Sequence, residues 1–162
     1  MDGDPVKDRV YLETTIVSYL CARPSRDLVV AAHQQITREW WATQRSRFDL
    51  YVSEIVLQEA SDGDLEAASR RLEALSDINV LVLTDDASEI ARSLVDRIAL
   101  PEKVYVDALH IAVAVVSGMD YLLTWNCAHI ANAAFRQRID DVCRFKGYEP
   151  PIICTPEELM EA

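Results

Sequence analysis

The sequence predicts an α/β fold, a three-layer α/β/α sandwich with a mainly parallel central sheet. Short apolar segments of strand length alternate along the chain with longer helical segments, the pattern of strand–helix–strand units. The first strand-like segment is nearly continuous in apolar residues, as in a strand covered on both faces. With 162 residues, 50% of them hydrophobic, the chain can bury a sizeable core, and we expect residues 1–162 to form a single domain.

The charge, the cysteines and the lack of long apolar runs limit which classes of protein the chain can belong to. Lys and Arg number 16 against 27 Asp and Glu, a formal net charge of −11, so nucleic-acid binding requires locally gathered basic residues or a bound cation. The four cysteines form no CxxC pair, and a core of this size needs no disulfides. The N-terminal MDGDPVKDR is polar and no apolar run approaches the roughly 20 residues that cross a bilayer. We therefore expect a cytoplasmic protein without a membrane segment.

The first expected strand, Arg9–Ser18, contains one carboxylate, Glu13, followed by Thr14 and Thr15. Burying an unpaired carboxylate costs several kcal/mol or forces its protonation. We therefore place Glu13 at the C-terminal end of a central strand, where open α/β sheets bind their ligands. The alternative is that Glu13 lies on the solvent-exposed face of an edge strand.

Two helices are expected next. Ser18 caps a short helix through Cys21, which the following proline ends, and a long helix runs from Leu28 to about Arg45. Its adjacent Trp40 and Trp41 cannot both face one core. One of them is therefore a candidate for a partner surface, unless both lie under neighbouring loops.

A second strand over Phe48–Ser53 leads into a helix that begins at Glu54, with Ser53 as its N-cap. Glu54 and Glu59 are five positions apart, so at most one points into a given site. The helix dipole explains Glu54. Glu59 lies beside the apolar stripe and is the better functional candidate.

The middle of the chain predicts a turn at Asp62–Asp64, an amphipathic helix over Leu65–Leu75, a buried strand over Asn79–Leu83 and a helix from Thr84 or Asp85 to about Ile98. Glu102–Ser117 is almost wholly apolar and predicts a central helix. Asp107 falls near its start, where the dipole favours an acid that still needs a partner. For His110, a satisfied core histidine is favoured over a ligand.

The last expected elements are a strand over Tyr121–Thr124, a helix from about Ala128 to Lys146, a strand over Pro150–Cys154 and a terminal helix starting at Thr155–Glu158. Asn126 stands where the chain leaves the sheet. Glu13, Glu59, Asp107 and Asn126 therefore occupy comparable places, because parallel topology brings the strand ends to one edge. Hard oxygen ligands of this kind suit Mg²⁺ or Mn²⁺, and one of the crowded carboxylates should hold a proton until the ion binds.

Four segments in this order resemble the acidic motifs of PIN-domain proteins, in particular VapC-like toxins of toxin–antitoxin pairs: YLETTIVSYL (11–20), SEIVLQEAS (53–61), VDALHIAVA (106–114) and LLTWN (122–126). The resemblance implies a Mg²⁺- or Mn²⁺-dependent endoribonuclease that cleaves RNA phosphodiester bonds with a metal-activated water. It also implies a small antitoxin partner and a homodimer. Carried over by position, Glu13, Glu59 and Asp107 are metal ligands, and Asn126 completes the catalytic set.

Two positions depart from the commoner pattern of this family. Glu13 is one methylene longer than the usual Asp, and Asn126 lacks the charge of the Asp often found there. The lost charge disfavours a second metal and indicates a one-metal site. The hydroxyls of Thr14 and Thr124 are candidates for binding a metal water, although β-propensity also explains both threonines.

Further residues are candidates for substrate binding or for other kinds of site. Arg23 and Arg26 are candidates for phosphate contacts, although a solvated loop explains them equally. A zinc site of Cys127, His129 and His110 matches no familiar spacing, and neither GxGxxG, a P-loop nor a nucleophile elbow occurs. The alternative function is a catalytically silent PIN-fold module that binds a protein partner through the two adjacent tryptophans.

Overall fold

The computed structural model describes residues 3, 5–98 and 104–161. Its centre is a five-stranded sheet with strand order β3-β2-β1-β4-β5, and every neighbouring pair is parallel. The strands are β1 (Arg9–Leu12), β2 (Asp49–Ser53), β3 (Asn79–Leu81), β4 (Tyr121–Leu123) and β5 (Ile152–Cys154). The predicted parallel sheet is confirmed.

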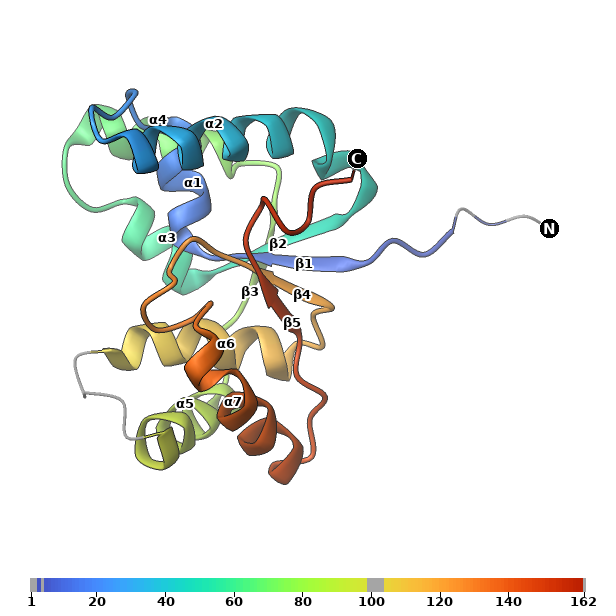
Figure 1. Ribbon diagram of the computed structural model, residues 1–162. Helices are drawn as coiled ribbons and strands as arrows, with labels where there is room; N and C mark the ends of the chain where they lie inside the picture. Colours follow the sequence, from blue (N-terminus) through green and yellow to red (C-terminus); the bar gives the residue numbers. More distant parts are fainter. Residues whose placement is uncertain (1–2, 4, 99–103, 162) are drawn as a thin grey trace.

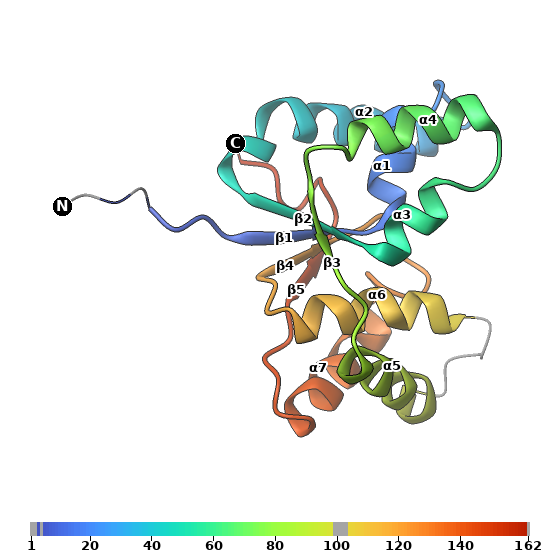
Figure 2. The ribbon, with the colours of Figure 1, turned by 180° about the vertical axis from the view of Figure 1, so that it is seen from behind.

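Helices cover both faces of the sheet (Figure 1). The described helices are α1 (Thr14–Cys21), α2 (Leu28–Thr43), η1 (Arg45–Arg47, a 3₁₀ turn), α3 (Glu54–Ala60), α4 (Leu65–Ala74), α5 (Asp85–Ile98), α6 (Tyr105–Val116) and α7 (Ala133–Phe145). Helices α1 to α4 lie on one side and α5 to α7 on the other, as the view from behind also shows (Figure 2). The arrangement is the expected three-layer sandwich.

The strand order fixes where a ligand can bind. The chain builds outward from β1 through β2 to β3, and then returns through α5 and α6 to place β4 on the other side of β1. A topological switch point therefore lies between β1 and β4, and open α/β sheets bind ligands beyond the C-terminal strand ends at such points. Leu12 and Leu123 pair at the ends of these two strands.

The first strand is shorter than predicted. β1 ends at Leu12, and Glu13 has extended backbone (φ −74°, ψ 157°) while its carboxylate accepts the N–H of Thr15 as the N-cap of α1. Because the cap supplies an acceptor for a free helical N–H, the helix starts at once. The apolar side chains of Ile16 and Val17 are buried on α1, so the prediction of a strand to Ser18 was wrong, although Glu13 does follow the strand.

Three further predictions need correction. The strand at Asn79 is an edge strand with Val80 half-exposed rather than a buried one. Helix α7 begins at Ala133, not near Ala128, because the Asn132 side chain caps it by accepting the N–H of Ala134. The segment after β5 forms turns rather than a terminal helix. The part of the predicted helix Glu102–Ser117 that precedes Val104 lies outside the described residues.

The two adjacent tryptophans differ in burial. Trp40 is fully buried, and its indole N–H donates to the carbonyl of Leu159 at 3.2 Å. Trp41 packs against the core at its edge, with the Arg45 guanidinium 4.2 Å from its ring centre. Trp40 therefore belongs to the core, whereas Trp41 keeps a partly exposed ring.

All four cysteines are free thiols, as expected. Burial raises the pKa of Cys143 and of Cys154 to about 12. None of the described helices combines the length and the apolar character needed to cross a bilayer.

Candidate active site

The first acid, Glu13, joins the ends of β1 and β4. Its side chain is buried, and its carboxylate accepts three hydrogen bonds: from the Thr15 N–H at 3.2 Å, from the Thr15 hydroxyl at 2.6 Å and from the Thr124 hydroxyl at 2.5 Å. A carboxylate has about four lone-pair sites. Glu13 is therefore compensated mainly by neutral donors, which explains how it lies at the end of the central strand.

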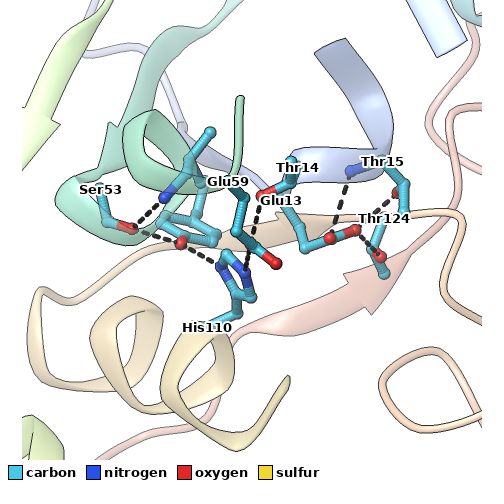
Figure 3. Close-up of polar contacts among 9 residues, drawn as sticks. Glu13, Thr14, Thr15, Ser53, Glu59, His110 and Thr124 are labelled. Carbon is cyan, nitrogen blue, oxygen red and sulfur yellow. Dashed lines mark hydrogen bonds and ion pairs between the residues drawn. The ribbon is translucent and has the colours of Figure 1, made fainter. Parts of the chain in front are cut away.

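The second acid, Glu59 on α3, is held by two donors on a single oxygen (Figure 3). The Thr14 hydroxyl donates to Oε1 at 2.6 Å, and Nε2 of His110 lies 2.6 Å from the same Oε1. No described residue donates to the other oxygen, Oε2, and the side chain is 39% exposed. Glu59 is thus anchored at one oxygen and keeps the other for a ligand. Glu54 accepts the N–H of Leu83 instead, so only one of the two acids reaches the site, as predicted.

The third acid, Asp107, lies in the first turn of α6. Its Oδ2 is 3.1 Å from Nδ1 of His129, and the side chain is 24% exposed. His129 is itself positioned by Asn126, whose Oδ1 accepts the His129 backbone N–H at 3.1 Å. The side chain of Asn126 therefore holds the turn after β4, and His129 lies beside the acid.

These contacts form a closed circuit around the C-terminal edge of the sheet. The Asn126 N–H donates to the Thr124 hydroxyl, which donates to Glu13. Thr14 follows Glu13 directly and donates to Glu59, which contacts His110 on α6. Asp107 precedes His110 by three residues and closes the circuit through His129. All four predicted site residues belong to this circuit, so the structure brings them to one edge.

The circuit sets the charge state of Glu59. Partial burial acts to raise the pKa of its carboxyl, but the hydrogen bonds from His110 and Thr14 outweigh burial and lower the pKa below its ordinary value. The hydroxyl of Tyr11 contacts Nδ1 of His110, and burial is the main cause that raises the pKa of Tyr11. At neutral pH Glu59 is an anion and Tyr11 a phenol.

The donor set fits a divalent ion held by few direct ligands. Within the described part of the chain, no three His, Cys, Asp or Glu side chains lie close enough to enclose an ion together. Glu59 and Asp107, however, each keep an oxygen to which no described residue donates, and both are partly exposed. Mg²⁺ binds in this way, through one or two carboxylates and several waters.

Sequence reasoning missed several residues of the circuit. Thr14 and Thr124, candidates for binding a metal water, donate to the carboxylates of Glu59 and Glu13, and residue spacing did not indicate these contacts. His129 had been weighed only as a zinc ligand; it lies three residues after Asn126, the spacing of a side-chain cap. His110 lies three residues after Asp107, which places it near the same face of α6.

The two predicted phosphate-binding arginines lie on the surface after α1. Arg23 lines a cavity of about 470 Å³ together with Arg70 and Arg71 and with the acidic residues Asp64 and Glu66. The guanidinium of Arg71 is engaged with the carbonyls of Ala60 and Asp62. Arg26 is exposed. Helix α1 connects this basic region to the circuit, because Thr14 and Cys21 are its two ends.

Comparison with protein families gives a match over residues 10–135, to the family described as PIN domain. The match covers all four predicted site residues. None of the curated proteins compared with the chain matches it significantly.

Solved structures with the same fold come from several bacteria. VapBC2 from Rickettsia felis, bound to a DNA fragment from its promoter, is 16% identical, with 91% of this chain and 98% of that chain covered and a TM-score of 0.58. VapC20 from Mycobacterium tuberculosis, a sarcin–ricin loop cleaving toxin, is 21% identical over 74% of this chain and 92% of that chain, with a TM-score of 0.57. A toxin–antitoxin complex from Klebsiella pneumoniae is 20% identical, with 76% of this chain and 92% of that chain covered and a TM-score of 0.56.

The lowered pKa of Glu59 predicts a pH-dependent effect on stability. A carboxyl whose folded pKa lies below its unfolded value stabilises the fold above about pH 4.5, the ordinary value, and loses this contribution as pH falls through the folded pKa. The free energy of unfolding of Glu59→Gln should therefore lie below that of the wild type near pH 7, and the difference should shrink below about pH 4.5. Denaturant titrations across this range measure it. Glu89→Gln, which changes an exposed acid of α5, is the control. A Glu59→Gln difference that does not vary with pH contradicts the assignment.

Proposed function

The chain belongs to the PIN domain family, and we propose on this premise that it is an endoribonuclease that cuts RNA phosphodiester bonds with Mg²⁺ or Mn²⁺. The observation that carries the proposal is the closed circuit at the switch point between β1 and β4. It gathers three carboxylates from distant parts of the sequence, and two of them keep an oxygen for a ligand. Enzymes that hydrolyse phosphodiesters use carboxylates in this way to bind metal ions.

Glu59 and Asp107 are the proposed direct ligands, and Glu13 adds a third negative charge to the same edge. When bound, the divalent ion supplies an activated water as nucleophile and offsets negative charge on the phosphodiester. The loss of charge at Asn126 favours a single ion. Because the Asn126 side chain accepts the His129 N–H, its proposed role is to hold His129 and the site wall in place.

The remaining residues of the circuit position the acids. Thr14 and His110 orient Glu59, while Thr15 and Thr124 hold Glu13. Neutral hydroxyl donors suit this task, because they stabilise carboxylates without cancelling the charge that attracts a cation. Arg23 and Arg26 are proposed to contact RNA phosphates outside the site, where a local basic region offsets the net charge of the chain.

The proposed biological role is that of a VapC-like toxin. Similar folds include VapBC proteins and a toxin–antitoxin complex, which supports a small antitoxin as partner of this chain. A homodimer, a single domain over residues 1–162 and a cytoplasmic location are parts of the same proposal. RNA is the substrate expected of this role, and one of the similar structures is described as a sarcin–ricin loop cleaving toxin.

Removing the charge of Asp107 should abolish cleavage. We expect Asp107→Asn, purified without metal and supplied with Mn²⁺, to cleave a mixed RNA pool at least about a hundredfold more slowly than the wild type, because loss of one stabilising charge of this kind removes roughly 3 kcal/mol from transition-state stabilisation. Gel or fluorescence assays of RNA cleavage measure the rate. The matched control is Asp86→Asn, which changes an exposed acid in the first turn of α5. Cleavage by Asp107→Asn at the wild-type rate refutes the assignment.

The two arginines should govern the salt dependence of RNA binding. The double variant Arg23→Ala/Arg26→Ala is expected to bind RNA more weakly and to reduce the slope of log K against log salt by up to about 1.4, since each single-strand phosphate contact contributes about 0.7. Fluorescence anisotropy with a labelled RNA at several salt concentrations gives the slope. Arg138→Ala/Lys146→Ala removes the same charge from α7 and its C-cap residue, in the other helical layer (Figure 1). An unchanged slope for the first pair removes both arginines from the interface.

A further inference from the structure

A string of buried polar groups leads through the core to Glu59 (Figure 3). Ser53, Tyr11 and His110 are 0%, 0% and 1% exposed, and they come from the end of β2, from β1 and from α6. The Tyr11 hydroxyl lies 2.8 Å from the Ser53 hydroxyl and 2.6 Å from Nδ1 of His110, whose Nε2 is 2.6 Å from Glu59. Buried polar groups destabilise a core unless each finds a partner, and here each partner is the next group in the string.

The hydrogens of this string can be placed by counting donors. The Val56 N–H donates to the Ser53 hydroxyl oxygen, so the Ser53 hydrogen is directed to Tyr11, its other partner. The Tyr11 hydrogen then goes to Nδ1 of His110, and the hydrogen on Nε2 goes to Glu59. In the reverse direction, with a hydrogen on Nδ1 donated to Tyr11, the buried Ser53 hydrogen has no acceptor among the described residues. Only the first arrangement uses every donor.

We propose that Tyr11 and His110 are positioning residues for Glu59: Tyr11 holds a neutral His110 with its hydrogen on Nε2, and His110 pins Glu59 by Oε1 so that Oε2 is presented to the ligand. The importance of this arrangement for metal binding rests on the proposed function; the arrangement itself does not. Thr14 donates to the same Oε1, and the two donors together fix the plane of the carboxylate.

A role for His110 that is limited to stabilising the core explains its two hydrogen bonds but not why one of them ends on Glu59. Two bonded ring nitrogens satisfy a core histidine wherever it lies, but they do not require that the string end on a partly exposed carboxylate. Among the described contacts of the three acids, two donors converge on one oxygen of Glu59 and none reaches the other. Asp107 has a single donor, and Glu13 receives donors on both oxygens. Rigid donors on a ligand increase metal affinity because they orient it before binding.

The test compares Tyr11→Phe with Tyr51→Phe. Tyr51 pairs in register with Tyr11 on the neighbouring strand β2, and no described residue hydrogen-bonds its hydroxyl. The first readout is metal-free nitrogen-15 NMR of the His110 side chain, with the folded state of each variant checked by its backbone amide spectrum. We expect one protonated nitrogen, Nε2, in the wild type and in Tyr51→Phe. In Tyr11→Phe the Nε2–H signal should broaden or exchange faster with water.

The second readout is Mn²⁺ binding by calorimetry. Tyr11→Phe should bind about fivefold more weakly than the wild type, the effect of one hydrogen bond, while Tyr51→Phe should bind normally. His110→Gln, which keeps an N–H donor, should bind more tightly than His110→Leu, which has none. Equal affinities in these two variants, or a hydrogen on Nδ1 of His110 in the wild type, overturn the proposal.

The two proposals fail in different ways. A wild-type protein that does not bind Mn²⁺ overturns the proposed metal-dependent function, and the metal-free spectra of His110 still decide whether Tyr11 and His110 hold Glu59. If the wild type binds Mn²⁺ but Tyr11→Phe changes neither the His110 signal nor the affinity, the positioning role is wrong and the metal site stands.

Discussion

The need to compensate carboxylates at the end of a buried parallel sheet determines the local structure of this protein. Glu13 follows the central strand, where an uncompensated charge would cost several kcal/mol. Its oxygens take hydrogen bonds from Thr15 and Thr124, so that one side chain both starts α1 and ties β1 to β4. The compensation comes from neutral donors. The edge therefore stays negative, and this is the property on which cation binding depends.

The order of the strands makes this edge a site. Because the chain crosses back after β3, the ends of β1 and β4 lie side by side, and α3 and α6 contact each other nearby through Glu59 and His110. Glu59 and Asp107 are thus brought toward Glu13 from opposite helical layers, one on each side of the sheet (Figure 1). Under the proposed function, a protein of net charge −11 approaches RNA only where that charge is locally offset, and the proposed cation at this edge and the proposed contacts of the arginines after α1 would serve that purpose.

The sequence predicted the layers and the edge but not the atoms that meet there. Glu13 was found from the sequence because it is the one acid within an apolar segment. Glu59 and Asp107 were found from their positions on predicted helices. Strand propensity at Ile16 and Val17 misled the prediction, because a side-chain cap decides where a helix starts regardless of β-branching. Contacts such as Thr124 with Glu13, 111 residues apart, follow from packing that residue spacing does not encode. His129 was misjudged because its partner, Asp107, lies on another element.

The most direct test of the metal site is a crystal structure of the protein soaked in Mn²⁺, with anomalous scattering used to locate the ion. We predict one strong peak with Glu59 Oε2 and Asp107 Oδ1 as ligands at about 2.0–2.6 Å, the range of hard cations with oxygen. Peaks only at other acidic surfaces, such as that around Asp8 and Asp120, with neither carboxylate in contact, would contradict this prediction.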